Sequence, residues 1–174
     1  MCIRSDFSIR VLKESDIDSL CHTFCFPWTT HQVTLEKWRR YYAEHQANNR
    51  IVCLLEASNQ LIGYGSLLHF SQHPYFKDNK IPEINDIWIK EELRNRGFGK
   101  ALITHLENRA HEEGDEKIGI GVGLYRDYGP AQKLYVEMGY VPDGKGITYK
   151  YVYVTPGEPY PVDDDLIVWM QKTL

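Results

Sequence analysis

The sequence predicts an α+β domain built around a mixed sheet. Segments with helical periodicity and segments rich in strand-forming residues follow one another without strict βαβ alternation. The chain of 174 residues is long enough to bury a core and short enough for one domain. No repeat, linker or low-complexity stretch divides it. We therefore expect residues 1–174 to form a single domain.

Two helices are predicted near the start, after a strand that begins at Phe7. Ser15 or Asp16 is placed to cap the first helix, whose apolar side chains recur at helical spacing. The second helix covers residues 34–49, with Thr34 at its N-cap position. We expect one apolar face of this second helix to pack on the core, through Leu35, Trp38 and Tyr42.

The middle of the chain predicts a hairpin and then an unusually polar strand. Two apolar runs joined by a short Ser-Asn-Gln turn indicate a hairpin over residues 50–70. We expect residues 71–80 to form a polar loop. The strand over residues 81–91 carries three polar side chains in an otherwise apolar run: Glu83, Asn85 and Asp86.

The second half of the chain alternates helices and strands. A helix with a buried stripe comes first, and Gly114 is placed to end it. Residues 117–124 indicate a strand interleaved with glycine, and residues 129–140 a short helix with Pro130 in its first turn. Late strands are expected over 147–154 and 166–171, with a rigid acidic loop between them. The stripe of the long helix consists of Leu102, Ile103, Leu106 and Ala110.

Composition excludes some classes of function. The net charge of −4 does not suit a general nucleic-acid binder, which needs a basic surface to displace counterions. The first residues lack the apolar core of a signal peptide, and no apolar run approaches the roughly 18 residues that span a bilayer. We therefore expect a cytoplasmic protein without membrane or nucleic-acid partners. Its four cysteines are expected to be thiols rather than metal ligands.

The stretch LRNRGFGKALITHL, residues 93–106, predicts an anion site at the start of a helix. The first turn of a helix leaves backbone N–H groups unpaired and adds partial positive charge. Gly97 and Gly99 remove side chains that would block a pyrophosphate, and Arg94 and Arg96 add charge. A Rossmann fingerprint would need a third glycine, and a Walker loop would need a hydroxyl after the lysine. The alternative is a turn that simply begins a helix.

Three features in this order resemble the GNAT superfamily of N-acetyltransferases, which bind acetyl-coenzyme A. They are the pattern Arg94-x-x-Gly97-x-Gly99, the polar strand before it, and the later segment AQKLYVEMGY. The resemblance is clearest from Ile81 to Tyr140 and extends more weakly to the opening strand and helix. It implies the GNAT acyltransferase fold, a central, twisted, mostly antiparallel sheet with splayed strands, flanked by helices.

The resemblance also implies where the coenzyme binds. The pyrophosphate would lie on the glycine turn, and the pantetheine arm along the strand before it, paired with backbone groups. Many relatives carry asparagine where this chain has Tyr128, so the chain departs from the family there. No metal is implied. The implied coenzyme contacts are Ile87, Trp88, Ile89, Arg94, Asn95, Arg96, Gly97, Phe98, Gly99, Lys100, Ala101, Tyr128 and Tyr135.

Acetyl transfer to an amine needs a base, an oxyanion donor and an acid. An alkylammonium has a pKa of about 10.4 and must lose a proton before its nitrogen can attack. Glu83 is the expected base, alone or with Asp86, and the alternative is a solvated carboxylate at a strand end. Tyr135 matches the tyrosine that the family places at the coenzyme sulfur, and the alternative is a core aromatic. The family uses a backbone amide near Ile87 for the oxyanion.

These expectations describe an acetyl-coenzyme A-dependent N-acetyltransferase in which the amine attacks the thioester directly in a ternary complex. The alternatives are a non-catalytic acyl-coenzyme A-binding or sensing module of the same fold and a protein-interaction domain. The acceptor would be the amine of a small molecule, or of a protein or peptide, and many relatives form homodimers. An acidic group in the late loop could hold a cationic acceptor or form a solvated turn: Glu158, Asp163, Asp164 and Asp165.

Overall fold

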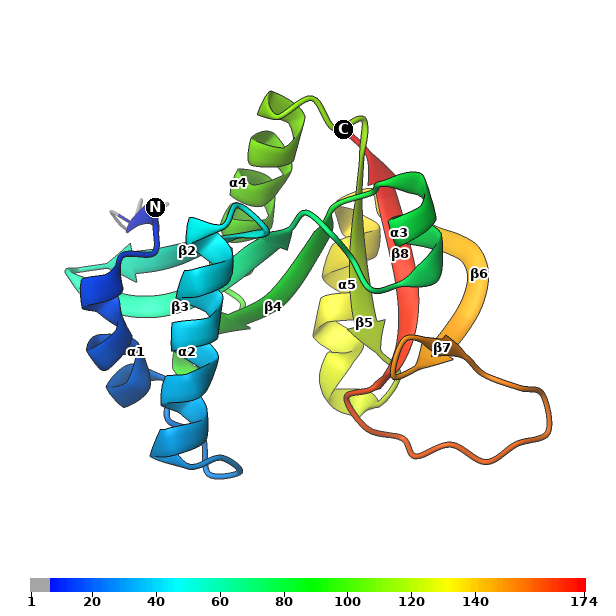
Figure 1. Ribbon diagram of the computed structural model, residues 1–174, viewed down its shortest axis with the longest axis horizontal. Helices are drawn as coiled ribbons and strands as arrows, with labels where there is room; N and C mark the ends of the chain where they lie inside the picture. Colours follow the sequence, from blue (N-terminus) through cyan, green and yellow to red (C-terminus); the bar gives the residue numbers. More distant parts are fainter. Residues whose placement is uncertain (1–6) are drawn as a thin grey trace. The chain divides into compact units, whose positions relative to one another are not determined.

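The computed structural model describes residues 7–174, which divide into two compact units (Figure 1). The first unit takes the chain up to Leu67 together with Asp86–Leu106, and the second takes Leu68–Asn85 together with Glu107–Leu174. Two strands and one long helix therefore contribute residues to both units. The prediction of a single domain stays a prediction.

The first unit contains four neighbouring strands in the order β1-β2-β3-β4. The two-residue turn between β2 and β3 has positive φ at both Ser58 and Asn59, as a type I′ hairpin turn requires. This confirms the predicted hairpin, and β1 pairs antiparallel with the outer side of β2. The strands are β1 (Phe7–Val11), β2 (Arg50–Ala57), β3 (Gln60–Leu68) and β4 (Glu83–Ile89).

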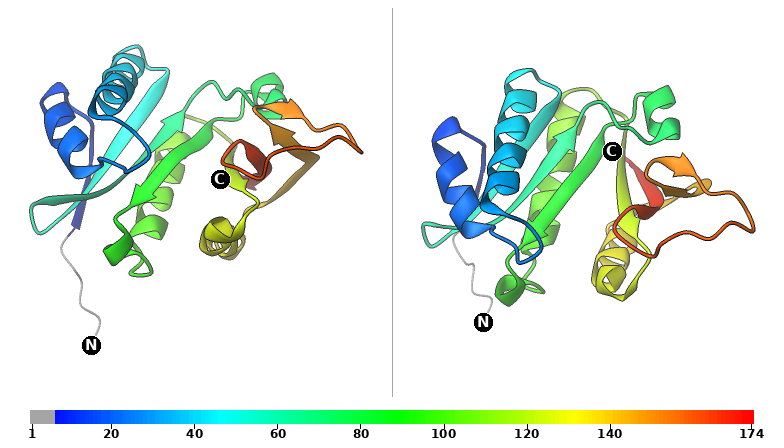
Figure 2. Two further views of the ribbon diagram at one scale, coloured as in Figure 1. Left: turned by 90° about the horizontal axis from the view of Figure 1, so that it is seen from below. Right: turned by 60° about the horizontal axis from the view of Figure 1, so that its bottom comes forward.

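Helices cover both faces of these strands, as Figure 2 shows. On one face lie α1 (Ile17–Thr23) and α2 (His31–Gln46), and Trp38 of α2 packs edge-on against Tyr64 of β3 at 4.8 Å between ring centroids. The start of α4 (Phe98–Glu112) covers the other face, where Leu102 lies against Gly65 of β3. The core between the strands and the first two helices includes Leu12, Ile17, Leu20, Phe24, Val52 and Leu54.

The starts of the first two helices agree with the prediction only in part. Asp16 is the N-cap residue of α1, as one of the two predicted candidates, but its carboxylate binds Arg10 and the Lys13 amide rather than an amide of α1, and a short 3-10 helix (Glu14–Asp16) precedes the helix. The N-cap of α2 is Thr30, whose hydroxyl accepts a hydrogen bond from the Val33 amide at 3.2 Å. The prediction that Thr34 caps this helix is therefore wrong, because the helix starts one turn earlier.

The second unit is built on the strand order β4-β5-β8-β6-β7. The first residues of β4 pair parallel with β5, Glu83 beside Gly119 and Ile84 beside Ile120. Strand β8 pairs antiparallel with β5 along seven positions and with β6 on its other side. The remaining strands are β5 (Lys117–Gly123), β6 (Val141–Tyr149), β7 (Val152–Tyr153) and β8 (Leu166–Thr173).

The three glycines of β5 make room for aromatic rings. A Cβ atom on Gly119 would lie 2.1 Å from the ring of Phe76, and one on Gly123 would lie 2.4 Å from the ring of Tyr128. Between them, a Cβ on Gly121 would lie 2.9 Å from Trp169 of the neighbouring strand. Because alternate residues of a strand share a face, the three glycines form one bare stripe beneath these rings.

Two segments of the second unit differ from the prediction. Residues 71–80 contain the helix α3 (Pro74–Asn79), which places Phe76 in the core and ends at Lys80 with a φ of 54°. The expected strand over residues 147–154 is broken by a turn in which Lys150 and Tyr151 both have positive φ, so β6 and β7 form a hairpin. In both cases the deviation depends on backbone conformations that the side-chain pattern did not reveal.

The remaining helices follow the prediction. The stripe of α4 is fully buried, and Gly114, with a φ of 95°, lies just past its end. Helix α5 (Gly129–Glu137) has Pro130 in its first turn, after a 3-10 helix (Arg126–Tyr128). Another 3-10 helix (Glu91–Leu93) follows β4.

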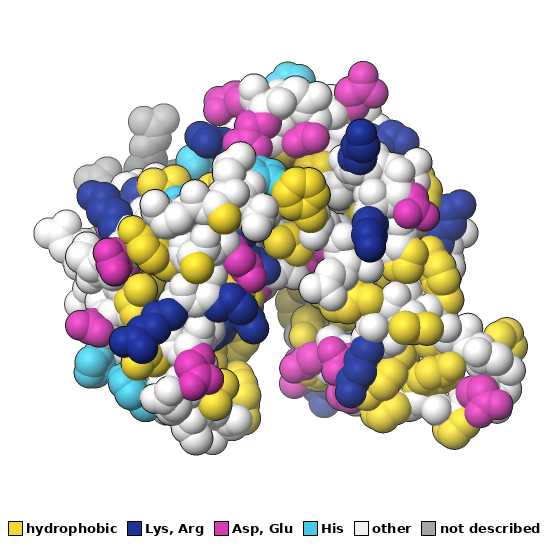
Figure 3. Space-filling model, in the orientation of Figure 1, with side chains coloured by type: hydrophobic (Ala, Val, Ile, Leu, Met, Phe, Trp, Pro, Cys, Tyr) yellow, Lys and Arg dark blue, Asp and Glu magenta, His cyan; other side chains and the backbone are white. Residues whose placement is uncertain are grey.

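Exposed hydrophobic side chains gather around β7 and the loop that follows it, among them Val152 and Val162 (Figure 3).

Candidate functional site

The end of β4 in the first unit is interrupted at Asp86. Its φ of 51° lies in the left-handed region, which is rare inside a strand and marks an irregularity such as a bulge. The residues after it, Ile87, Trp88 and Ile89, complete the strand. The backbone therefore leaves the regular strand geometry at the position where the resemblance implies the coenzyme arm and the oxyanion donor.

The Asp86 carboxylate is occupied by partners from α2. Lys37 Nζ lies 2.6 Å from Asp86 Oδ2, and the Tyr41 hydroxyl donates to the same oxygen at 3.0 Å. The Lys37 ammonium also donates to the Tyr64 hydroxyl and lies 4.9 Å from the centroid of that ring. Burial raises the pKa of both tyrosines, so their hydroxyls stay protonated. Asp86 thus forms an ion pair with Lys37, and the rings of Tyr41 and Tyr64 lie beside the ammonium.

Glu83 lies at the start of β4, in the second unit, and is only 2% exposed. The Ser71 hydroxyl donates to its Oε2 at 2.5 Å, and the Asn85 amide donates to its Oε1 at 2.7 Å. The alternative of a solvated carboxylate at a strand end is therefore wrong for this residue. A buried carboxylate with a donor on each oxygen is an expensive arrangement that needs its partners.

The glycine turn of the first unit leads directly into α4. Asn95 and Gly97 have φ angles of 61° and 87°, and nothing lies within 4 Å of the position a Gly97 Cβ would take. The Ala101 amide bonds to the Gly97 carbonyl at 2.9 Å and thereby closes the first turn of the helix. The three amides before it, from Phe98 to Lys100, have no acceptor one turn back within the helix.

The side chains around this turn are divided between surface and core. Arg94 is 44% exposed, lies 4.7 Å above the ring of Trp88, and donates from Nε to the Ile89 carbonyl. Arg96 and Lys100 are exposed as well. Phe98 is buried and packs edge-on against Phe7, so only its backbone can face a ligand. The exposed side chains of Arg94, Arg96 and Lys100 and the open backbone at Gly97, all implied coenzyme contacts, therefore lie in the same turn.

Tyr135 and Tyr128 belong to the second unit. Tyr135 of α5 is 8% exposed, and burial raises its pKa to about 12. The Tyr128 ring covers Gly123, and its hydroxyl donates to Asp164 at 2.9 Å. Burial, followed by this bond, raises the pKa of Tyr128. Its polar end is therefore directed to the acidic loop.

That acidic loop is tied down by tyrosines. Tyr125 also donates to Asp164, and Tyr149 donates to Asp163 at 3.1 Å. Asp163 further accepts the amide of Asp165 at 3.0 Å. Asp164 and Asp165 are exposed, as the alternative of a solvated turn expects, while Asp163 and Asp164 also accept hydrogen bonds from tyrosines of the second unit. Whether they hold a cationic acceptor stays a prediction.

An exposed aromatic group beside β4 was missed in the sequence. Phe26 and Trp28 are stacked, with ring planes 3° apart, and both approach Trp88 of β4. Trp28 is 71% exposed although it is one of the largest apolar side chains. The sequence signal was the segment FPWTT between the first two helices, which appeared only as a break.

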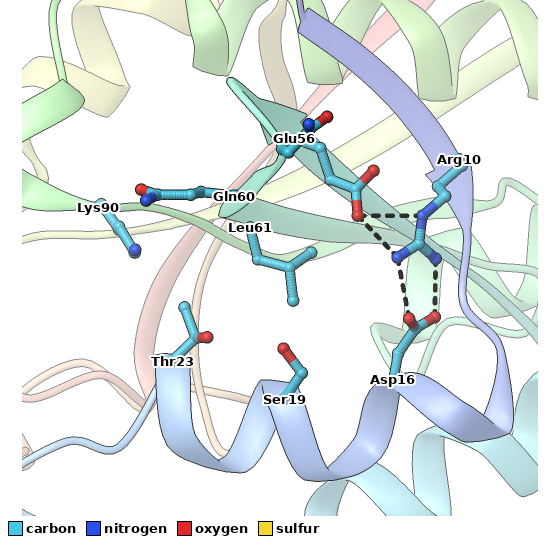
Figure 4. A pocket seen from close by; sticks show the side chains of 9 residues that line it. Arg10, Asp16, Ser19, Thr23, Glu56, Gln60, Leu61 and Lys90 are labelled. Atoms are coloured by element: carbon cyan, nitrogen blue, oxygen red, sulfur yellow. Dashed lines mark hydrogen bonds and ion pairs between the residues drawn. The ribbon is translucent and has the colours of Figure 1, made fainter.

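The first unit also contains an open, polar groove of about 440 Å³ (Figure 4). Arg10 bridges Asp16 and Glu56 on its wall, at 2.7 Å to each carboxylate. Burial opposes ionisation of Asp16, but the hydrogen bonds from Arg10 and Lys13 prevail and lower its pKa. None of the predicted catalytic or coenzyme-binding residues lines this groove, and its charges neutralise one another.

Three of the four cysteines lie among the described residues. Cys21, Cys25 and Cys53 form no disulfide, burial raises the pKa of the Cys21 thiol, and Cys2 lies outside the described residues. Among residues 7–174, no three His, Cys, Asp or Glu side chains are grouped to hold a metal ion. Within the same range, no helix combines the length and hydrophobicity that a membrane crossing requires.

Comparison with known proteins places these features in context. The model of the acetyltransferase (GNAT) family matches residues 15–140, well over half of the chain. L-ornithine N5-acetyltransferase NATA1 of Arabidopsis thaliana is 28% identical over 102 residues. That match covers 55% of this chain and 42% of the plant protein, so the chain spans less than half of that relative.

Solved structures share the fold at low identity. The Salmonella typhimurium acetyltransferase that modifies the N-terminal serine of ribosomal protein L7/L12 has a TM-score of 0.72, 14% identity, and coverage of 99% of this chain and 98% of its own. PaiA N-acetyltransferase of Thermoplasma acidophilum, solved with coenzyme A, has a TM-score of 0.65 and 17% identity, and the match covers 97% of this chain and 99% of that one. A spermidine N-acetyltransferase chimera of Vibrio cholerae SpeG and hSSAT has a TM-score of 0.67 and 19% identity, and the match covers 97% of this chain and 96% of that one. These likenesses establish the GNAT fold.

Proposed function

Because the chain belongs to the GNAT family of acetyltransferases, we propose that it transfers the acetyl group of acetyl-coenzyme A to a primary amine. The amine would attack the thioester directly, in a ternary complex. Its nitrogen forms a bond to the carbonyl carbon, the carbon–sulfur bond breaks, and the thiolate leaves as coenzyme A. The proton lost by the ammonium and the proton gained by the sulfur each need a protein group.

The observation that carries this proposal is the open start of α4. Gly97 adopts a φ of 87° with open space where its side chain would be, and the first amides of the helix follow. Arg94, Arg96 and Lys100 add exposed positive charge around those amides. Backbone donors, a helix dipole and cations together favour a diphosphate. We assign the coenzyme pyrophosphate to residues 94–101.

Glu83 is the better candidate for the base. Asp86 already neutralises the half-buried Lys37 ammonium and accepts from Tyr41, so using it as a base would cost that ion pair. Glu83 accepts hydrogen bonds from Ser71 and Asn85, two neutral donors that favour the carboxylate form. Since Glu83 is 2% exposed, we propose that a water carries the proton from the acceptor ammonium to it.

Tyr135 is the proposed acid for the departing thiolate. Burial raises its pKa to about 12, so the phenol holds its proton across the physiological range. A protonated hydroxyl is what a leaving sulfur requires. The irregular backbone at Asp86 supports the remaining role, that of the Ile87 amide as oxyanion donor, because it turns a peptide group out of the regular strand geometry.

The names of the relatives indicate an amine as the acetyl acceptor, and they differ in the molecule that carries it. L-ornithine, spermidine and the N-terminal serine of a ribosomal protein are the acceptors that those names state. All three present a primary amine. We therefore propose a primary amine acceptor, with small amines and peptide N-termini as the two kinds to compare.

A thermal-shift experiment with a matched glycine pair tests the coenzyme site. Coenzyme A at 100 times its Kd should add about 2.7 kcal/mol of stability to the parent protein. Gly97→Val should lower the Tm and abolish that gain. Gly157 has nearly the same φ of 89° and equally open surroundings, so Gly157→Val carries similar backbone strain and should keep the gain.

Turnover separates catalysis from binding alone. Thiol release is measured with acetyl-coenzyme A and a panel that contains ornithine, spermidine and short peptides with free N-termini. Stabilisation by coenzyme A with no thiol release from any amine would point to a non-catalytic binding module. An equal loss of stabilisation in both glycine variants would contradict the site at residues 94–101.

A further inference from the structure

The carboxylate of Glu83 is held from two sides by neutral donors. Ser71, in the segment before α3, donates to Oε2, and Asn85, two residues farther along β4, donates to Oε1. Ser71 and Glu83 are 3% and 2% exposed, whereas Asn85 is half-buried. Of the two donors, Asn85 is therefore the more exposed.

The direction of the Ser71 hydroxyl is fixed by its own backbone neighbourhood. The His73 amide donates to Ser71 Oγ at 3.1 Å, so that oxygen already accepts one bond and its proton is available to Glu83. The His73 side chain is fully buried, with Nε2 2.7 Å from Asp143 and its ring stacked on Trp169 at 4.4 Å.

The residue that donates to Ser71 Oγ, His73, is itself held by other parts of the second unit. His73 is the N-cap residue of α3, Asp143 belongs to β6 and Trp169 to β8. These contacts hold His73, whose backbone amide donates to Ser71 Oγ. His73 and Asp143 are the titratable groups of this support, and burial, opposed by Asp143, lowers the pKa of His73. The imidazole is accordingly neutral near pH 7 and adds no charge beside the carboxylate.

We propose that Ser71 and Asn85 are positioning residues, which keep Glu83 ionised and oriented to receive the proton of the acceptor amine. The proposal rests on the proposed function, in which Glu83 is the base. The physical reason is that hydrogen bonds to a carboxylate stabilise its charged form, while burial opposes it. The two neutral donors therefore offset part of the cost of burying the charged carboxylate.

The pH dependence of kcat/KM tests this role. Ser71→Ala and Asn85→Leu each remove one donor and should move the acid limb upward by about one to two pH units, because a bond to a charged group contributes that much. At a pH on that limb, kcat/KM should fall about tenfold or more, while the plateau at higher pH is kept. Ser71→Thr retains the hydroxyl and should keep the parent profile.

Controls separate this proposal from the one on which it rests. All variants are compared with the same acceptor, so that the titration of the amine cancels, and Ser19→Ala serves as an exposed serine control. If Glu83→Gln keeps the parent acid limb, Glu83 is not the base and the proposed function needs revision. If Glu83→Gln removes that limb but Ser71→Ala and Asn85→Leu leave it in place, only the positioning role is overturned. Should Ser71→Ala fail to fold, the half-buried Asn85→Leu decides alone.

Discussion

Adding one methyl group at Gly119 should destabilise the second unit. A Cβ there would lie 2.1 Å from Cε2 of Phe76 and 2.4 Å from Cζ, more than 1 Å inside normal contact. Phe76 cannot move aside easily, because it is fully buried and packs edge-on against Trp169 and His73. We expect Gly119→Ala to cost about 1–3 kcal/mol, the usual range for overpacking a core.

The assay is thermal or denaturant unfolding of a set of variants. For a chain of this size, the loss should lower the Tm by roughly 2–4 °C for each kcal/mol. Gly123→Ala should cost less, because the half-buried Tyr128 ring that it meets can shift toward solvent. In a Phe76→Ala background, Gly119→Ala should cost almost nothing, since the obstructing ring is gone. Equal effects of Gly119→Ala with and without the Phe76 ring would refute this explanation of the glycine.

Further predictions concern Tyr135, the N-cap of α2 and His73. Tyr135→Phe should lower kcat about 100-fold or more without weakening coenzyme A binding, and an unchanged kcat would exclude it as the acid. In the parent, a pKa of about 12 for Tyr135 predicts no alkaline loss of kcat from this group below about pH 11. Thr30→Ala should cost about 1 kcal/mol as a lost N-cap, visible as a lower Tm, whereas Thr29→Ala should cost less. The lowered pKa of His73 means that the unfolded chain binds its proton more readily, so stability is complete above about pH 6.5 and declines below it. His73→Gln should therefore flatten the fall in Tm between about pH 7 and pH 5, and an unchanged slope would contradict that assignment.

The sequence predicted the elements whose signals are local. The hairpin of β2 and β3, the stripe of α4 and the glycine that follows α4 were read from periodicity and turn residues alone. The start of α2 was misplaced because two threonines, Thr30 and Thr34, stand one helical turn apart and both suit an N-cap. Helix α3 was missed because its sequence is polar except for Phe76 and its neighbour Tyr75.

The site was predictable as a set of residue types but not as a set of partners. The polar strand indicated Glu83 and Asp86 as candidates, and either one fitted the chemistry. Their difference depends on Lys37 and Ser71, which lie far from them in sequence and come together only in the fold. The stripe of glycines in β5 was visible as well, but the rings that require it belong to distant segments.

The placement of the indoles gives the chain two built-in optical probes. Trp38 is 1% exposed in the first unit, and Trp169 is 2% exposed in the second. Replacing the other tryptophans by phenylalanine and keeping one of these two would let intrinsic fluorescence follow the melting of each half separately. Coincident transitions would indicate that both halves unfold as one cooperative body, and separate transitions would reveal a chain that comes apart in two steps.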